Sequence, residues 1–147
     1  MGAYARVAIA AMHGYALGAG LEMALLCDLR VAAEDTRLGL PEVGLGYIPS
    51  AGGTQTLPRT IAPGVAMHMI LSGDPIDAAE AYRLRLVHRV VPREELDAAA
   101  GAWAETLASR SPQALAYAKE AVVRGLDLPL AEGLALEARL GRLLAGS

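Results

Sequence analysis

The first third of the chain alternates short apolar runs with glycine-rich turns. Residues 6–12 (RVAIAAM) form an apolar run that ends at a glycine turn, which predicts a strand buried on both faces. A loop over residues 14–20, a short helix over residues 21–26 and a second strand over residues 29–33 are expected next. A strand, a glycine loop, a helix and a further strand in this order predict a parallel crossover unit.

Glycine and proline interrupt the middle of the chain, so residues 38–50 are expected to form turns and short pieces. Helices over residues 64–72 and 78–84 then lead to a last strand over residues 87–91. The pattern therefore predicts an α/β core over residues 1–91.

The remaining residues, 92–147, carry helical periodicity. Leucine, alanine and Trp103 recur at helical spacing up to residue 110, and leucines line a further helix over residues 130–144. Ser111 followed by Pro112 is a helix start signal, because Ser accepts a hydrogen bond from a free N–H group and Pro fits the first helical position. We therefore expect a C-terminal helical segment over residues 92–147.

Composition places the chain among globular proteins, since 54% of its 147 residues are hydrophobic and 20% are charged. The net charge of −3 comes from interspersed signs without a basic stripe, so no nucleic-acid partner is expected. The lone Cys27 excludes an internal disulfide and, with no signal-peptide pattern ahead of the first strand, favours a cytoplasmic location. The three histidines share no metal-ligand spacing, so no metal is assigned.

A membrane span is the first alternative for the N-terminal part. From Val7 to Cys27 only His13 and Glu22 interrupt an apolar run about as long as a bilayer-spanning helix. Glycines break the middle of this run, and a charged Glu22 at mid-bilayer costs about 2.5–3.5 kcal/mol. We therefore expect no membrane segment.

Two glutamates beside glycine-rich turns are the candidate catalytic residues. Glu22 lies in HGYALGAGLEMALLCD, where a loop enters a helix and leaves N–H groups near Ala19 and Gly20 without intrahelical partners. Such donors, aided by the helix dipole, hold an anion or a developing oxyanion. Glu42 follows Pro41 in LGLPEVGLGYIPSAGGTQ, and a pair of carboxylates suits proton transfer on an activated acyl group.

Each of these features also has a purely structural explanation. The glycines suit a tight strand-to-helix turn, Glu22 complements a helix dipole without any chemistry, and Glu42 is compatible with an exposed turn. Gly52-Gly53 fits either a backbone anion site or a plain helix entrance. A dinucleotide-binding unit is a further alternative, but the glycines run Gly-x-x-x-Gly-x-Gly rather than Gly-x-Gly-x-x-Gly, and the helix is short.

The stretch VAIAAMHGYALGAGLEMALLCDLRVAAEDTRLGLPEVGLGYIPSAGGTQTLPR, followed by MILSGDPIDAAEA, LVHRVVP and SPQALAYAKEAV, resembles the crotonase superfamily of enoyl-CoA hydratases and isomerases. The resemblance covers nearly the whole chain and implies a crotonase-type core of repeated strand-helix units over residues 1–91, N-terminally truncated relative to full-length relatives. Residues 92–147 would then be a helical oligomerisation segment, and a homotrimer or a dimer of trimers is implied.

The resemblance also implies roles for individual residues. The backbone N–H of Ala19 matches one of two donors to the thioester oxygen, and Glu22 and Glu42 match a catalytic pair. In that scheme Glu42 supplies the α-proton, while Glu22 binds and deprotonates the water that adds to the β-carbon. The implied substrate-binding residues lie around this pair: Ala16, Leu17, Gly18, Gly20, Pro49 and Ser50. No separate cofactor is expected, because CoA is part of the thioester substrate.

The function implied is that of an enoyl-CoA hydratase-like lyase, which converts a 2-enoyl-CoA to a 3-hydroxyacyl-CoA. An enoyl-CoA isomerase and a truncated, non-catalytic fragment that associates through its helical tail are the alternatives. Two positions depart from the family pattern. Arg85 stands where relatives usually place Gly, which predicts an altered helix end, and Ser50 replaces a common Gly near the water site.

Overall fold

The computed structural model describes residues 6–146, which fall into two compact units. Residues 8–102 form the larger unit, and the described residues 6–7 and 103–146 form the smaller one. The larger unit carries all the strands of the described chain and every candidate site residue.

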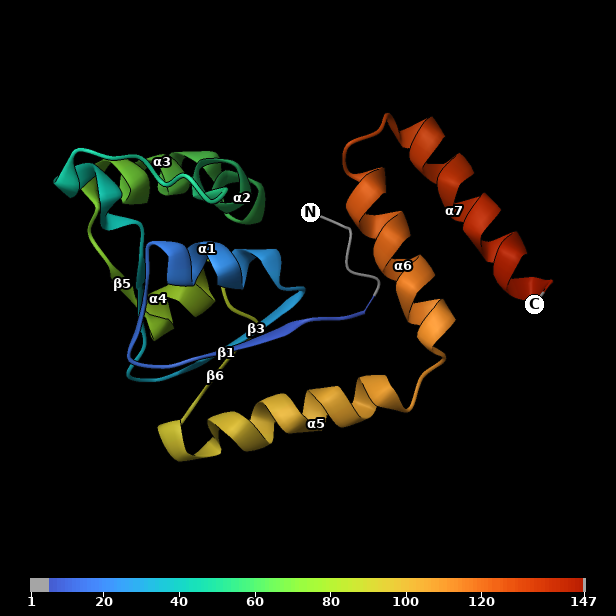
Figure 1. Ribbon diagram of the computed structural model, residues 1–147, viewed down its shortest axis with the longest axis horizontal. Helices are drawn as coiled ribbons and strands as arrows, with labels where there is room; N and C mark the ends of the chain where they lie inside the picture. Colours follow the sequence, from blue (N-terminus) through green and yellow to red (C-terminus); the bar gives the residue numbers. More distant parts are fainter. Residues whose placement is uncertain (1–5, 147) are drawn as a thin grey trace. The chain divides into compact units, whose positions relative to one another are not determined.

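A parallel sheet forms one layer of the larger unit. Its strands are β1 (Ile9–Met12), β3 (Leu29–Ala33) and β6 (Arg89–Val91), in the order β1-β3-β6. Helix α1 (Ala19–Leu26) lies between β1 and β3 in sequence and covers this sheet (Figure 1). The predicted parallel crossover is therefore confirmed.

A second small sheet positions the loop that enters α1. It pairs β2 (Tyr15–Leu17) with β4 (Arg37–Gly39) in parallel, and β4 with β5 (Ile76–Asp77) in antiparallel. The ladder continues one step past β2, where Gly18 N donates to Gly39 O at 2.9 Å. This bond fixes the residue immediately before α1.

Short helices complete the larger unit. The 3-10 helix η1 (Pro41–Leu45) follows β4, and the helices α2 (Gly53–Thr60) and α3 (Pro63–Ser72) pack against each other (Figure 1). Helix α4 (Ala78–Arg83) starts at Asp77, whose carboxylate accepts from Glu80 N at 2.8 Å, and leads to β6. The 3-10 helix η2 (Arg93–Glu95) precedes α5 (Leu96–Ala108).

The core of this unit is aliphatic. The largest fully buried hydrophobic side chains are contributed by α1, α2, α3, β3, β4 and the segments next to β4 and β6: Leu21, Leu25, Leu57, Met69, Val31, Leu38, Leu40, Leu86 and Val87. Among the described residues, four polar side chains are also buried: Glu22, Arg30, Thr36 and Thr56. Thr36 Oγ1 lies 2.7 Å from Ala33 O and 3.1 Å from Met12 O, and Arg30 is bound by backbone carbonyls.

The smaller unit is built on a helical hairpin. Helix α6 (Pro112–Gly125) begins at Ser111, whose hydroxyl accepts from Ala114 N at 3.3 Å, as the Ser-Pro signal predicts. Helix α7 (Leu130–Ala145) packs against α6. Lys119 of α6 donates from Nζ to Arg6 O at 2.9 Å. Several apolar side chains of the hairpin remain exposed: Val122, Leu126, Leu130, Leu134 and Leu143.

The structure corrects several expectations. Residues 14–20 are not a plain loop, because β2 lies within them and α1 begins at Ala19 rather than Leu21. Residues 38–50 include the end of β4 and η1. The first and last strands are shorter than predicted, since pairing begins at Ile9 and at Arg89. The membrane alternative is wrong for residues 7–27, which form two strands and a short helix, and no helix in residues 6–146 is long and apolar enough to cross a bilayer.

Candidate active site

Glu22 lies in the first turn of α1 and is buried, with 3% of its surface exposed. Its backbone N–H donates to Gly18 O at 3.0 Å, which places it one turn after the N-cap. Its carboxylate oxygen Oε1 accepts from Ala51 N at 2.9 Å and from Gly53 N at 2.8 Å. Two backbone donors therefore fix one carboxylate oxygen, and no hydrogen bond to Oε2 is found within residues 6–146.

The turn that holds Glu22 requires glycine at two successive positions. Gly52 has a φ of 111°, a conformation that side chains rarely adopt. A Cβ on Gly53 would lie 3.0 Å from Glu22 Oε1, 3.0 Å from Leu40 Cδ1 and 3.0 Å from Pro49 Cβ. The Gly52-Gly53 pair is thus a backbone anion site as well as a helix entrance, and the anion it binds is the Glu22 carboxylate.

Glu42 approaches the same helix end from η1. Pro41 begins this 3-10 helix and Glu42 follows it in the first turn. The Glu42 oxygen Oε1 lies 3.0 Å from the position that a Cβ on Gly18 would occupy. Its other oxygen, Oε2, is buried and has no hydrogen-bond partner in the described part of the chain. Glu42 is therefore partly buried against the N-cap of α1 rather than standing in an exposed turn.

Ala19 is the first residue of α1, and its N–H precedes the first intrahelical hydrogen bond. No hydrogen bond from Ala19 N or Gly20 N is found among residues 6–146. Gly18 has φ 54° and ψ −125°, and no side chain caps the helix in its place. The start of α1 therefore offers unpaired backbone donors beside the Glu42 carboxylate.

The other predicted substrate-binding residues occupy different environments. Ala16 is buried in β2 opposite Leu38, and Leu17 is half-buried at the end of the same strand. Gly20 and Ser50 are exposed, whereas Pro49 is buried against Gly53. Their roles in binding substrate stay predictions.

Sequence reasoning did not identify the donors that hold Glu22. Ala51 N and Gly53 N belong to the backbone, so their identity carries no side-chain signal, and they lie 29 and 31 residues from Glu22 in sequence. The consecutive glycines at positions 52 and 53 were the available signal, because paired glycines at a helix entrance allow close approach of an anion.

Comparison with known proteins places the chain among enoyl-CoA hydratase relatives. The model of the enoyl-CoA hydratase/isomerase family matches residues 3–144. A probable enoyl-CoA hydratase of Mycobacterium tuberculosis is 48% identical over 132 residues, which cover 90% of this chain and 51% of the relative. The 2,3-dehydroadipyl-CoA hydratase of Escherichia coli is 46% identical over 145 residues, covering 99% of this chain and 57% of the relative.

Solved structures show the same fold. An enoyl-CoA hydratase from Bacillus anthracis superposes with a TM-score of 0.95 at 43% identity, covering 97% of this chain and 55% of that chain. The chain spans about half the length of the relatives it matches. It belongs to the enoyl-CoA hydratase/isomerase family, the crotonase superfamily.

Proposed function

We propose that this protein is an enoyl-CoA hydratase-like lyase, which adds water across the double bond of a 2-enoyl-CoA to give a 3-hydroxyacyl-CoA. The observation that carries the proposal is the placement of two carboxylates, those of Glu22 and Glu42, at one end of α1 beside unpaired backbone N–H groups. Family membership supports an acyl-CoA thioester as the substrate.

In this proposal the start of α1 binds the thioester oxygen of the substrate. Ala19 N–H donates to the thioester oxygen, which gains negative charge as the enolate develops. The positive end of the helix dipole favours that charge, and a preorganised donor of this kind contributes about 2.7–4 kcal/mol in acyl chemistry. Because Gly18 is fixed by its hydrogen bond to Gly39 O, the donor is in place before substrate arrives.

The two glutamates then divide the proton transfers. Glu22, anchored through Oε1, uses Oε2 to accept a proton from the water whose oxygen forms a bond to the β-carbon. Glu42 enters protonated and gives its proton to the α-carbon. Each addition leaves a proton on Glu22 and removes one from Glu42, so a proton passes back between the two carboxylates before the next turnover.

An enoyl-CoA isomerase is the second candidate, since a single carboxylate at Glu42 suffices to move a proton between two carbons of the acyl chain. The two activities differ in product. Hydration adds the mass of one water, whereas isomerisation shifts the double bond at constant mass. A non-catalytic fragment is the third candidate. The absence of turnover in the folded wild-type chain would favour it.

The remaining proposals concern location and assembly. A cytoplasmic location is supported by the free cysteine, Cys27. Assembly as a homotrimer or a dimer of trimers through residues 92–147 is supported by the exposed leucines of the helical hairpin. Sedimentation of the purified chain measures this directly, and a monomer at all concentrations would contradict it.

The test of function is hydration of crotonyl-CoA, followed by loss of the conjugated thioester absorbance and by product mass. Glu22→Gln and Glu42→Gln are each expected to lower the rate by at least about 100-fold, because each removes one proton-transfer group. Glu34→Gln is the matched control, since Glu34 is exposed beyond β3. Wild-type rates in both variants of the pair would exclude the assignment, whereas loss in both with the control unchanged supports it.

A further inference from the structure

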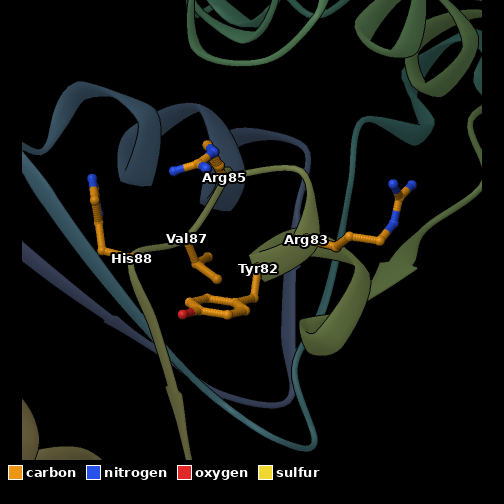
Figure 2. A pocket seen from close by; sticks show the side chains of 5 residues that line it. All are labelled: Tyr82, Arg83, Arg85, Val87 and His88. Carbon is orange, nitrogen blue, oxygen red and sulfur yellow. The ribbon is translucent and has the colours of Figure 1, made fainter.

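A pocket lies in the larger unit where α4 leads into β6. Its volume is about 360 Å³, and it is lined by Tyr82, Arg83, Arg85, Val87 and His88 (Figure 2). Behind it, Arg30 donates to Leu86 O and to Cys27 O, which places the pocket near the C-terminal end of α1. The candidate active site lies at the other end of α1, about 12 Å away for a helix of eight residues.

Arg85 occupies a backbone position that glycine favours. Its φ of 62° is the only positive value for a non-glycine residue among those the structure describes. Arg85 N donates to Tyr82 O at 3.0 Å and Leu86 N donates to Ala81 O at 2.8 Å, which is the hydrogen-bond pattern of a Schellman helix end. The sequence predicted that Arg85, in place of Gly, would alter this helix end. That prediction is wrong, because Arg85 adopts the left-handed conformation that glycine would adopt there.

An arginine at a left-handed helix end costs free energy that glycine would avoid. Strain of this kind persists where the side chain has a function, and it supports a role for the guanidinium group. The Arg85 side chain is exposed, and no hydrogen bond or ion pair from it is found within residues 6–146. Arg83 differs, because its Nε donates to Glu80 Oε2 at 2.6 Å and its charge is thereby neutralised.

A buried arginine, Arg30, adjoins the lining residue His88. Arg30 is 7% exposed, and its guanidinium donates at 2.8 Å to the neutral carbonyls of Leu86 and Cys27, with Asp28 compensating part of its charge. Burial and the nearby Arg30 charge together lower the pKa of His88. Positive potential at this depth attracts an anion to the pocket entrance.

The donors are arranged around a small apolar surface. His88 Nδ1 accepts from Arg30 N at 3.0 Å, so the neutral imidazole carries its hydrogen on Nε2. Figure 2 shows the side chains of Tyr82, Arg85 and His88 around Val87, with Arg83 apart from them. Tyr82 is exposed over 57% of its surface and adds a phenol hydroxyl and an aromatic face.

We propose that this pocket binds the phosphate group of a small phosphorylated molecule, with Arg85 as the principal donor. A guanidinium presents two parallel N–H groups to a phosphate, and the negative charge of phosphate complements the positive charge of Arg85. The Tyr82 hydroxyl supplies a further donor. The proposal concerns a site separate from Glu22 and Glu42 and does not depend on hydration activity.

The test is a titration of the ¹⁵N-labelled chain at constant ionic strength with inorganic phosphate, adenosine 5′-monophosphate and adenosine. Phosphate and the monophosphate are expected to shift the amide signals of residues 82–88 saturably, and adenosine is expected not to. Equal affinities for the first two identify the phosphate group as the whole ligand, whereas tighter binding of the monophosphate identifies an organic phosphate. An absence of saturable shifts, or adenosine equal to the monophosphate, overturns the proposal.

Two variants connect binding to Arg85. Arg85→Gly is expected to weaken phosphate binding by at least about tenfold while the fold becomes no less stable, because glycine favours the positive φ. Arg59→Ala removes an equal charge from α2, where Arg59 contacts Gln55, and is expected to leave affinity unchanged. Unchanged affinity in Arg85→Gly would refute the role of Arg85.

Discussion

Gly18→Ala tests how closely Glu42 of η1 approaches the start of α1. The added Cβ would lie 3.0 Å from Glu42 Oε1, nearer than nine in ten real Cβ contacts. Gly18 also has φ 54° and ψ −125°, a conformation in which a non-glycine residue costs about 1–3 kcal/mol. The substitution therefore combines backbone strain with a contact that pushes the Glu42 carboxylate away.

The two contributions separate in a double-mutant cycle with Glu42→Ala. Because Glu42 Oε1 is the end of a flexible side chain, this unfavourable contact is expected to lower the free energy of unfolding by only about 0.5–1 kcal/mol. Backbone strain is present in both backgrounds and cancels, so the coupling energy reports the contact alone. Gly14→Ala is the matched control, since Gly14 has φ 59° and no atom within 4 Å of its Cβ position; its coupling to Glu42 is expected to be zero.

Urea unfolding of the four proteins in each cycle measures these energies. If hydration is the activity, a displacement of the Glu42 carboxylate by about 1 Å lowers the crotonyl-CoA rate by about 100-fold in Gly18→Ala. Gly14→Ala is expected to keep its rate while it remains folded. Equal coupling energies for Gly18 and Gly14, with equal rates, would refute the inferred contact between Gly18 and Glu42.

Three further predictions concern Glu22, His88 and Glu42. Glu22→Ala leaves Ala51 N and Gly53 N without an acceptor and is expected to cost about 2–4 kcal/mol in urea unfolding, whereas Glu22→Gln keeps an oxygen there and costs about 1 kcal/mol; equal losses would contradict this. Burial and Arg30 lower the pKa of His88 from 6.5, so the unfolded chain binds the His88 proton more tightly than the folded chain does. The free energy of unfolding is therefore expected to fall as the pH drops below about 6.5, and His88→Asn is expected to flatten that pH dependence. Glu42→Met removes the unpartnered Oε2 and is expected to leave stability unchanged or raise it, measured by the same unfolding.

The sequence predicted correctly those elements that are determined by neighbouring residues, such as an apolar run or a helix-capping pair. The strand at residues 29–33 matches the observed β3, whose apolar residues 31–33 are fully buried in the sheet. The start of α6 follows from Ser111-Pro112. Strand β2 was missed because its hydrogen bonds go to residues 37–39, and three residues among glycines give no periodicity. Helix α1 begins before the predicted Leu21 because Gly18 serves as its N-cap by conformation alone.

The candidate site, too, was predictable from the sequence only in part. Glu22 and Glu42 stood out in the sequence because both carboxylates adjoin glycine-rich turns. That each reaches the start of α1 is decided by tertiary contacts, of Glu22 with Gly53 and of Glu42 with Gly18, and spacing along the chain does not encode these contacts. The positive pocket at Arg85 was signalled only by an arginine in place of an expected glycine, since its meaning depends on a φ value that sequence does not give.

The two carboxylates differ in how the fold holds them, and this difference supports the roles proposed for them. Glu22 is held by two backbone donors in a buried helix, so its remaining oxygen keeps one position throughout a reaction. Glu42 lies in a short 3-10 turn followed by exposed residues, and its buried Oε2 has no partner within residues 6–146. A buried acceptor without a donor costs free energy that a bound donor recovers. A carboxylate oxygen with a fixed position suits the base that we propose for Glu22, and a carboxyl group with an unmet hydrogen bond suits the acid that we propose for Glu42.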